Sequence, residues 1–320
     1  MEGSVGRVVI GVDLGGTNLR AAVLSSAGEI LRRHKEETRA ADGWEKVVAR
    51  LADAIKRQRS GAAEKGWEVC AVGVGAPGVI QNNGVVVKSP NFPDWNNLPL
   101  KKLLEKSVGV PVFLENDANA AALGELWQGA GKGVGSMILL TLGTGVGGGI
   151  VLGKKIWQGA DGMAGEIGHM TLLPEGRPCT CGNTGCLEMY ASARGIVQSY
   201  REAIGYGPET GAQITSEQVY ETARAGNANA VRVMQDMGRM LGIGIASLIN
   251  IFNPERIVLG GGVKEAWPLF IDATRAEIRK RAFAVPANRA ELVPSQLGDD
   301  AGMVGAAAVA LQDENVKRQP

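Results

Sequence analysis

The sequence predicts an α/β protein in which strands and helices alternate around mixed sheets. Short β-branched runs end in glycine turns, and longer stretches carry apolar residues at helical spacing. The chain has 320 residues, which suffices for two domains or for one large divided domain. Glycine supplies 46 of them, about twice its usual share of ~7%. These glycines form neither a collagen period nor a flexible linker, so tight turns and close packing are expected.

Composition and charge exclude several classes of protein. The chain carries 34 Lys and Arg against 33 Asp and Glu, so its formal charge of +1 offers no basic surface to nucleic acid. Four cysteines in a chain of this length make no disulfide framework. The first residues lack a basic and apolar leader, and the longest apolar stretch, 137–153, is interrupted by glycine and threonine. We therefore expect a cytoplasmic protein without nucleic-acid or membrane partners.

The individual elements follow from the same patterns. Strands are expected where β-branched and other apolar residues alternate or run together, and helices where apolar residues recur at intervals of three and four. In the first half these are strands at 7–14, 18–24, 29–35, 69–75 and 110–114, and helices at 44–59, at 97–106 and after residue 117. In the second half they are strands at 136–142, 149–155 and 256–259, and helices at 227–250, 265–281 and 302–311.

Two internal features relate the halves and the helices. The strand–turn–strand units at 8–24 and 136–155 resemble each other in pattern, which indicates a structural repeat. The long helix at 227–250 carries one apolar stripe and therefore one buried face. Gly238, Gly242 and Gly244 lie along it, where the missing side chain lets another backbone approach closely.

Several glycine loops invite comparison with nucleotide-binding motifs. Gly-x-Gly-x-x-Gly occurs at 73–78 and at 143–148, but a dinucleotide site needs a helix directly after the loop, and β-rich residues follow both. Residues 148–155 resemble a P-loop, but Lys155 stands where a Ser or Thr should meet Mg²⁺. Both interpretations are rejected.

The alternative is that turn glycines expose backbone N–H groups that bind phosphate. Simple hairpin turns would explain any one of these loops, but they recur at the start of both halves and again at 260–262. Asp13 is a candidate for holding Mg²⁺ through water. This layout resembles the fold of sugar kinases, heat-shock proteins and actin, in which ATP lies between two lobes. The candidate ATP- and Mg²⁺-binding residues are Asp13, Gly15, Gly16, Thr17, Asn18, Gly143, Thr144, Gly145, Gly261 and Gly262.

Three of the four cysteines and one of the two histidines fall within 18 residues. Cys179, Cys181 and Cys186 follow His169, and one His with three Cys forms a closed tetrahedral set for structural Zn²⁺. The glycine and asparagine between the cysteines allow tight turns around a metal. The alternatives are buried free thiols or a disulfide, and a cytoplasmic setting disfavours the disulfide.

Acidic residues lie at the end of a strand and around the cysteines. Asn116 and Asp117 are favoured at a helix N-cap, which is one explanation of their presence. The other is a base that accepts a proton from a substrate hydroxyl during phosphoryl transfer. Glu166 and Glu188 bracket the cysteines; they are solvated charges, or a bound metal holds them rigidly. Fixed carboxylates and amides suit a polyol, whose hydroxyls need fixed donors and acceptors.

Together these motifs resemble those of the ROK family (repressors, open reading frames and sugar kinases) and, within it, bacterial glucokinases. The residues that carry the resemblance are 13–18, 115–121, 142–149, 165–169, 179–186 and 259–262. The resemblance implies a two-lobed, actin-like and ribonuclease-H-like fold with mixed sheets and an active-site cleft between the lobes. The implied small lobe is 1–120 completed by a C-terminal helix at 299–320, and the large lobe is 121–298 with a zinc-binding segment at 169–186.

The resemblance also implies a reaction and residue roles. The reaction is ATP-dependent phosphorylation of glucose at the 6-hydroxyl, giving glucose 6-phosphate and ADP, in a homodimer or homotetramer. Asp117 matches the family's catalytic base. The sugar contacts are matched by Gly78, Asn91, Asn116, Asp117, Glu166, His169 and Glu188, and the zinc ligands by His169, Cys179, Cys181 and Cys186.

Three alternatives stay open. The substrate can be another hexose (N-acetylmannosamine, fructose, mannose or allose), or the donor can be polyphosphate. A sugar-sensing regulator is the second alternative; family repressors carry an N-terminal DNA-binding helix-turn-helix, whereas a strand is expected here from residue 7. A zinc-stabilised binding module is the third alternative. It is disfavoured because it would not explain the glycine turns that are expected to bind nucleotide.

Overall fold

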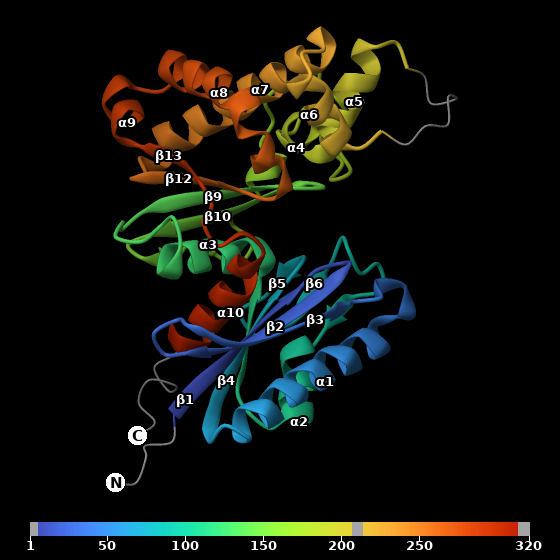
Figure 1. Cartoon of the computed structure of the whole chain (residues 1–320), viewed down its shortest axis with the longest axis vertical. Coiled ribbons are helices and arrows are strands. Elements are labelled where there is room, and N and C mark those ends of the chain that lie inside the picture. Colours follow the sequence, from blue (N-terminus) through green and yellow to red (C-terminus); the bar gives the residue numbers. More distant parts are fainter. Residues whose placement is uncertain (1–5, 207–213, 313–320) are drawn as a thin grey trace. The chain divides into compact units, whose positions relative to one another are not determined.

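The computed structural model describes residues 6–206 and 214–312 (Figure 1). The described chain forms two compact units, and each is treated by itself. The first comprises 6–135, 149–165 and 296–312, and the second the remainder. The expected lobe boundary at residue 120 differs from this division, because α3 (Asp117–Gln128) continues unbroken through that point and packs on α10 (Ala301–Gln312). Residues 313–320 of the expected C-terminal segment lie outside the described residues.

A five-stranded mixed sheet with the order β3-β2-β1-β4-β8 forms the centre of the first unit. β1, β4 and β8 are parallel, whereas β2 is antiparallel to both of its neighbours. The predicted α/β class with mixed sheets is therefore confirmed. The strands are β1 (Gly6–Leu14), β2 (Asn18–Ser25), β3 (Ile30–Glu37), β4 (Trp67–Ala76) and β8 (Val112–Asn116).

Successive side chains of β1 point to opposite faces of this sheet, so β1 contributes to a hydrophobic core on each face. Ile10 and Val12 belong to the core that contains α1 (Trp44–Ala63) and α2 (Leu100–Val108). Val9 belongs to the core that contains α10, and Figure 1 shows α1 and α10 on opposite faces of the sheet. Glycine allows the close approach of α10, because a Cβ at Gly73 of β4 would lie 1.7 Å from the Ala306 carbonyl oxygen.

Shorter elements complete the first unit. A three-stranded sheet has the order β5-β6-β7. The helix expected at 97–106 begins only at Leu100, because residues 96–98 pair with β6 as a strand and Pro99 precedes the helix. The elements are η1 (Ala40–Asp42), β5 (Val79–Ile80), β6 (Val86–Lys88), β7 (Asn96–Leu98), β11 (Lys155–Ile156) and η5 (Gly298–Asp300).

The second five-stranded sheet has the order β11-β10-β9-β12-β13, and β9, β12 and β13 run parallel. The boundary between the units falls within β10, after residue 148. β10 begins three residues before the expected 149, so the glycines at 147 and 148 are strand residues rather than part of a turn. The strands are β9 (Met137–Leu142), β10 (Val146–Leu152), β12 (Arg256–Gly260) and β13 (Glu291–Pro294).

Helices of the second unit gather on one side of these strands (Figure 1). The long helix with one buried face is confirmed as α7, and Gly238 and Gly242 approach α8 backbone as predicted. Gly244 instead faces the side chains of Leu187 and Met170. No helix within the described ranges is both long and apolar enough to cross a membrane. The helices are η2 (Ile167–His169), α4 (Glu188–Ala191), α5 (Ala193–Ala203), α6 (Ser216–Arg224), α7 (Ala228–Phe252), η4 (Gly262–Ala266), α8 (Trp267–Arg281) and α9 (Ala284–Arg289).

Candidate active site

In the first unit, candidate residues lie where three neighbouring parallel strands end. The register pairs Asp13 of β1 with Gly75 of β4, and Gly75 with Glu115 of β8. Asn116 and Asp117 follow at the same edge, which is where open α/β sheets bind ligands. A Cβ at Gly75 would lie 3.7 Å from the Asp117 Cα, so the start of α3 lies directly over β4. The sheet thus brings Asp13 and Asp117 to one edge.

Asp13 is a largely buried carboxyl group in acidic surroundings. Burial raises its pKa from 3.8 to about 6; the Arg20 guanidinium opposes this rise, and the charges of Asp117 and Asp299 add to it. Arg20 donates to Asp13 Oδ2 at 3.3 Å and to Asp299 Oδ2 at 2.8 Å. Carboxylate oxygens at a strand end are suitable ligands for hydrated Mg²⁺. The residues present therefore fit the predicted magnesium site.

Asn116 is the N-cap of α3. Its Oδ1 accepts hydrogen bonds from the backbone N–H groups of Ala118 at 2.9 Å and Asn119 at 3.2 Å. Its Nδ2 donates to the Gly78 carbonyl oxygen at 3.1 Å. The N-cap explanation is confirmed for Asn116, and its contact with a sugar stays a prediction.

Glu115 is a buried residue whose supporting role was missed in the sequence. Its Oε1 accepts from the Asn116 backbone N–H at 2.9 Å and from Asn119 Nδ2 at 3.0 Å. Its Oε2 accepts from Gln158 Nε2 at 2.6 Å. The carboxylate therefore holds the start of α3, and with it Asp117, in one orientation. Only its place beside Asn116 and Asp117 signalled a role.

Gly78 and Asn91 join the same edge. Gly78 has φ +114, and a Cβ there would lie 2.3 Å from the Lys88 carbonyl oxygen, so only glycine fits without displacement. Asn91 lies against the β1–β2 turn, because a Cβ at Gly16 would lie 2.6 Å from its Nδ2. The structure thus brings Gly16 beside Asn91, and Gly78 beside Asn116. Thr17 at the tip of the turn is exposed.

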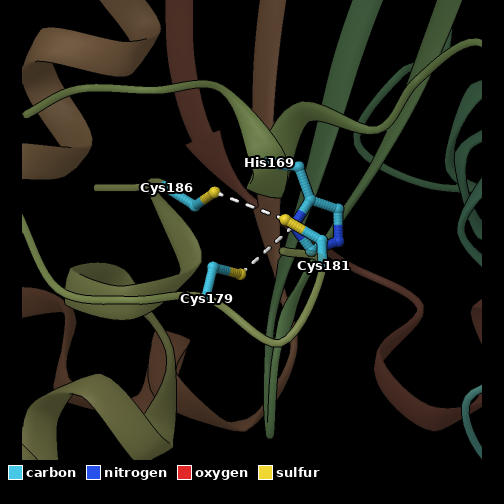
Figure 2. Close-up of side chains that lie close together, drawn as sticks. All are labelled: His169, Cys179, Cys181 and Cys186. Atoms are coloured by element: carbon cyan, nitrogen blue, oxygen red, sulfur yellow. Dashed lines mark hydrogen bonds between the residues drawn. The ribbon is translucent and has the colours of Figure 1, made fainter. Parts of the chain in front are cut away.

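The second unit contains the predicted metal-ligand cluster, whose four side chains converge in Figure 2. Their ligand atoms all lie within 4.8 Å of one another. The Sγ atoms of Cys181 and Cys186 are 3.7 Å apart, and Cys179 Sγ is 3.6 Å from His169 Nδ1. Tetrahedral Zn²⁺ with its usual bond lengths separates two sulfurs by ~3.8 Å and a sulfur from a nitrogen by ~3.6 Å. The donor set and its spacing therefore fit zinc.

The thiols of this cluster differ in their ease of ionisation. Burial raises the pKa of the Cys186 thiol to about 12. A hydrogen bond from the Asn183 backbone lowers the pKa of the exposed Cys181 thiol. A divalent cation stabilises thiolates strongly, so metal binding and ionisation of Cys186 are coupled.

His169 presents its two ring nitrogens to different neighbours. Nδ1 faces Cys179, whereas Nε2 lies 4.0 Å from Glu166 Oε2. If Nδ1 binds the metal, Nε2 carries the proton and faces the carboxylate. Both residues come from η2 and the residue before it, and Gly168 lets this segment contact Val146 at the start of β10.

Glu188 connects the cluster to the glycine turn at 143–145. Its Oε2 accepts from the Val146 N–H at 3.0 Å, and its Oε1 accepts from Arg194 Nη2 at 2.9 Å. A Cβ at Gly145 would lie 2.3 Å from the same Oε2. Glu188 follows the last cluster cysteine by two residues, so one short segment supports both features.

The remaining candidate loops of the second unit lie together at the ends of β9 and β12. The register pairs Gly260 with Thr141, so the loops after both strands are neighbours. Gly261 has φ +81, and a Cβ there would lie 2.3 Å from the Leu142 carbonyl oxygen. Thr144 is exposed, and Gly262 has open space beside it. The predicted nucleotide loops are thus adjacent within this unit.

The sequence pattern of the ROK family matches residues 9–313. This chain belongs to the ROK family. A glucokinase of Halalkalibacterium halodurans is 41% identical over 319 residues, which cover 97% of this chain and 96% of that protein.

Solved ROK structures share the fold. A ROK family glucokinase from Streptomyces griseus, crystallised with glucose and AMPPNP, is 39% identical with a TM-score of 0.79, and the match covers 96% of this chain and all of that one. A ROK family transcriptional regulator, a homologue of the E. coli MLC protein, is 33% identical with a TM-score of 0.85; the match covers 95% of this chain and 78% of the regulator. The predicted α/β sugar kinase fold is confirmed.

Proposed function

We propose that this protein is an ATP-dependent glucokinase that phosphorylates glucose at its 6-hydroxyl. The observation that carries the proposal is the edge of the first sheet, where Asp117 and Asp13 lie beside the glycine turn at 15–17. Phosphoryl transfer needs a group that receives the hydroxyl proton, ligands for Mg²⁺ and donors for phosphate oxygens, and this edge offers all three. Identity to a glucokinase over nearly the whole chain supports the same activity.

Each group of the first unit has a role in this proposal. Asp117 accepts the proton of the sugar hydroxyl, and Glu115 keeps Asp117 oriented through the start of α3. Asp13 would hold Mg²⁺, which keeps several water ligands in proteins. Turn N–H groups at Gly16, Thr17 and Asn18 bind phosphate oxygens, whereas the Gly15 N–H donates to the Asn18 carbonyl oxygen at 2.9 Å. When bound, the magnesium nucleotide supplies the phosphoryl group and offsets its negative charge.

The second unit serves sugar recognition and nucleotide binding. Glu166 and Glu188 are predicted to accept from hexose hydroxyls, and His169 to donate to them. Gly78, Asn91 and Asn116 of the first unit are the other predicted sugar contacts. Zinc, when bound, would have a structural role: His169, Cys179, Cys181 and Cys186 would hold it, and with its Nδ1 toward Cys179, His169 would present the proton on Nε2 at a defined point. Thr144 and the glycines at 143, 145, 261 and 262 are proposed to contact the nucleotide.

Location and assembly complete the proposal. A reducing cytoplasm would keep the three cluster thiols free to bind a metal, and all described cysteines are free thiols. A homodimer or homotetramer stays a prediction, which the molar mass in solution tests directly.

The test is a coupled assay that compares hexoses and donors with one protein preparation. Glucose, mannose, fructose, allose and N-acetylmannosamine are each offered with ATP and with polyphosphate. We expect the highest kcat/KM for glucose with ATP. A higher value for another hexose, or turnover with polyphosphate alone, would contradict the proposal.

A sugar-sensing regulator is the second candidate, because a transcriptional regulator shares the fold closely. The two candidates differ in turnover. A regulator would bind sugar without forming a phosphoester, whereas the proposed kinase consumes one ATP for each glucose.

A further inference from the structure

Thr38 is a completely buried residue that belongs to none of the motifs described above. It directly follows β3, and it contacts the β1–β2 turn twice. Its Oγ1 donates to the Gly15 carbonyl oxygen at 2.7 Å, and its backbone N–H donates to the Thr17 carbonyl oxygen at 2.8 Å. The carbonyls of Gly15 and Thr17 therefore point toward Thr38.

These two contacts determine the direction in which neighbouring N–H groups of the turn point. In a trans peptide, the carbonyl of one residue and the N–H of the next point in opposite directions, and the described chain has no cis bond. The Gly16 and Asn18 N–H groups consequently point away from Thr38. A carbonyl oxygen on that side would repel a phosphate, whereas an N–H group attracts it.

A turn of this kind needs an external constraint. Gly15 and Gly16 have no side chains, so their peptide groups rotate with little steric resistance. The constraint is itself anchored, because Arg50 of α1 donates to the Thr38 carbonyl oxygen at 2.5 Å and to Asp42 Oδ2 at 2.7 Å. Thr38 thus connects the turn to a helix packed on the first sheet.

We propose that Thr38 is a positioning residue for nucleotide binding, which directs the Gly16 and Asn18 N–H groups toward the phosphates. The inference rests on the proposed function only in taking the β1–β2 turn as a phosphate-binding turn. Thr38 itself touches no substrate. Its hydroxyl acts by occupying the Gly15 carbonyl oxygen, so a side chain of equal shape without a donor should lose the effect.

Thr274 provides a matched control. It is also completely buried, and its Oγ1 donates to the carbonyl oxygens of Gly238 at 2.9 Å and Phe270 at 3.1 Å. Thr274 lies in α8 and faces α7. Neither of its described side-chain hydrogen bonds involves a candidate site residue. Thr274→Val therefore removes the same buried group without altering a glycine turn.

The experiment compares Thr38→Val, Thr38→Ser and Thr274→Val with the unaltered protein. Calorimetry measures the Kd of AMPPNP and of glucose separately, and thermal unfolding measures stability. Loss of one hydrogen bond that orders the turn should raise the AMPPNP Kd about 5- to 20-fold in Thr38→Val. The glucose Kd should change less than about twofold, and Thr38→Ser, which retains the donor, should bind AMPPNP within about threefold of the unaltered protein.

Several outcomes would overturn the proposal. Thr38→Val must weaken AMPPNP binding more than Thr274→Val does; an equal fall in stability without a selective change in Kd leaves Thr38 a structural residue only. An unaltered protein that does not bind AMPPNP overturns it as well. A protein that binds AMPPNP but does not phosphorylate glucose contradicts the proposed function alone, and the Thr38 comparison still decides this inference.

Discussion

The two glycine turns proposed to bind nucleotide are held by different means. In the first unit, the neutral Thr38 donates to carbonyl oxygens of the turn at 15–17. In the second unit, the Glu188 carboxylate accepts from Val146, and the Ala193 N–H donates to the Gly143 carbonyl oxygen at 2.8 Å. Glu188 lies two residues after a metal-cluster cysteine. We therefore expect the conformation of the second turn to depend on bound zinc, and that of the first turn to be independent of it.

The largest effect is expected from substitution of Asp117. It should lower the rate of phosphoryl transfer much more than the affinity for glucose. Asp117→Asn keeps the size of the side chain but removes the base, so kcat should fall about 10²- to 10⁴-fold, with a much smaller change in glucose affinity. Steady-state kinetics and calorimetry measure the two quantities. Asp236→Asn, an exposed carboxylate of α7, is the control. Turnover near that of the unaltered protein would remove Asp117 from its proposed role.

Loss of zinc tests whether the proposed sugar contacts beside the cluster, His169 and Glu188, depend on the metal. Cys181→Ser removes one of four ligands, so bound zinc should fall from about one ion per chain toward none, and glucose affinity should fall at least about tenfold. Metal analysis and calorimetry give both values. Cys70→Ser is the matched control, because Cys70 lies outside the cluster and accepts from Arg7.

Cys181→Ser also tests whether the two glycine turns are held independently of each other. Thr38→Val should raise the AMPPNP Kd by a similar factor with and without the Cys181 substitution, because Thr38 holds its turn through hydrogen bonds within the first unit. A strong dependence of the Thr38 effect on zinc would show that the two turns are not held independently.

A smaller effect is expected from a single methyl group in the second turn. Gly145→Ala places a Cβ 2.3 Å from Glu188 Oε2, so the carboxylate must move away from Val146. The KM for glucose should rise about tenfold, the size of one lost charge-assisted hydrogen bond. Gly143→Ala in the same turn has open space for its methyl group and should change this KM less. Equal effects of both variants would contradict the proposed contact.

The last effect concerns the pH dependence of stability in the first unit. The pKa of Asp13 is raised to about 6 from an ordinary value of 3.8, so the folded chain holds this proton more tightly than the unfolded chain. The contribution of Asp13 to stability therefore falls as pH rises from about 4 to about 6. Asp13→Asn should lose this fall, as measured by urea unfolding across that range in metal-free buffer. If the free energy of unfolding of Asp13→Asn followed the same pH dependence as that of the unaltered protein, the raised pKa of Asp13 would be refuted.

The predictability of the fold from sequence varied with the range of the interactions involved. β1 follows from a run of β-branched and other apolar residues, and α7 from apolar residues spaced three and four apart, which are local signals. The residues at 147 and 148 were missed as strand because glycine has no strand preference of its own, and pairing within the sheet decides their conformation. The strand at 96–98 was missed for the same reason, since it exists by pairing with β6.

The candidate site shows the same division. The proposed zinc ligands span 18 residues with a characteristic spacing, so the sequence alone predicts the cluster that the structure brings together. Thr38 and Gly15 are 23 positions apart, and Glu115 and Gln158 are 43 apart. A hydroxyl or a carboxylate with a distant partner has no spacing signal, so supporting residues emerge only when the chain is folded.

The most direct test of the proposed reaction follows the phosphorus atom by NMR. ³¹P NMR of a reaction with glucose and Mg–ATP should show glucose 6-phosphate and ADP forming in equal amounts with the unaltered protein, and neither product above background with Asp117→Asn. Formation of ADP without a sugar phosphate, phosphorylation at another hydroxyl, or equal product from both proteins would contradict a glucokinase that uses Asp117 as its base.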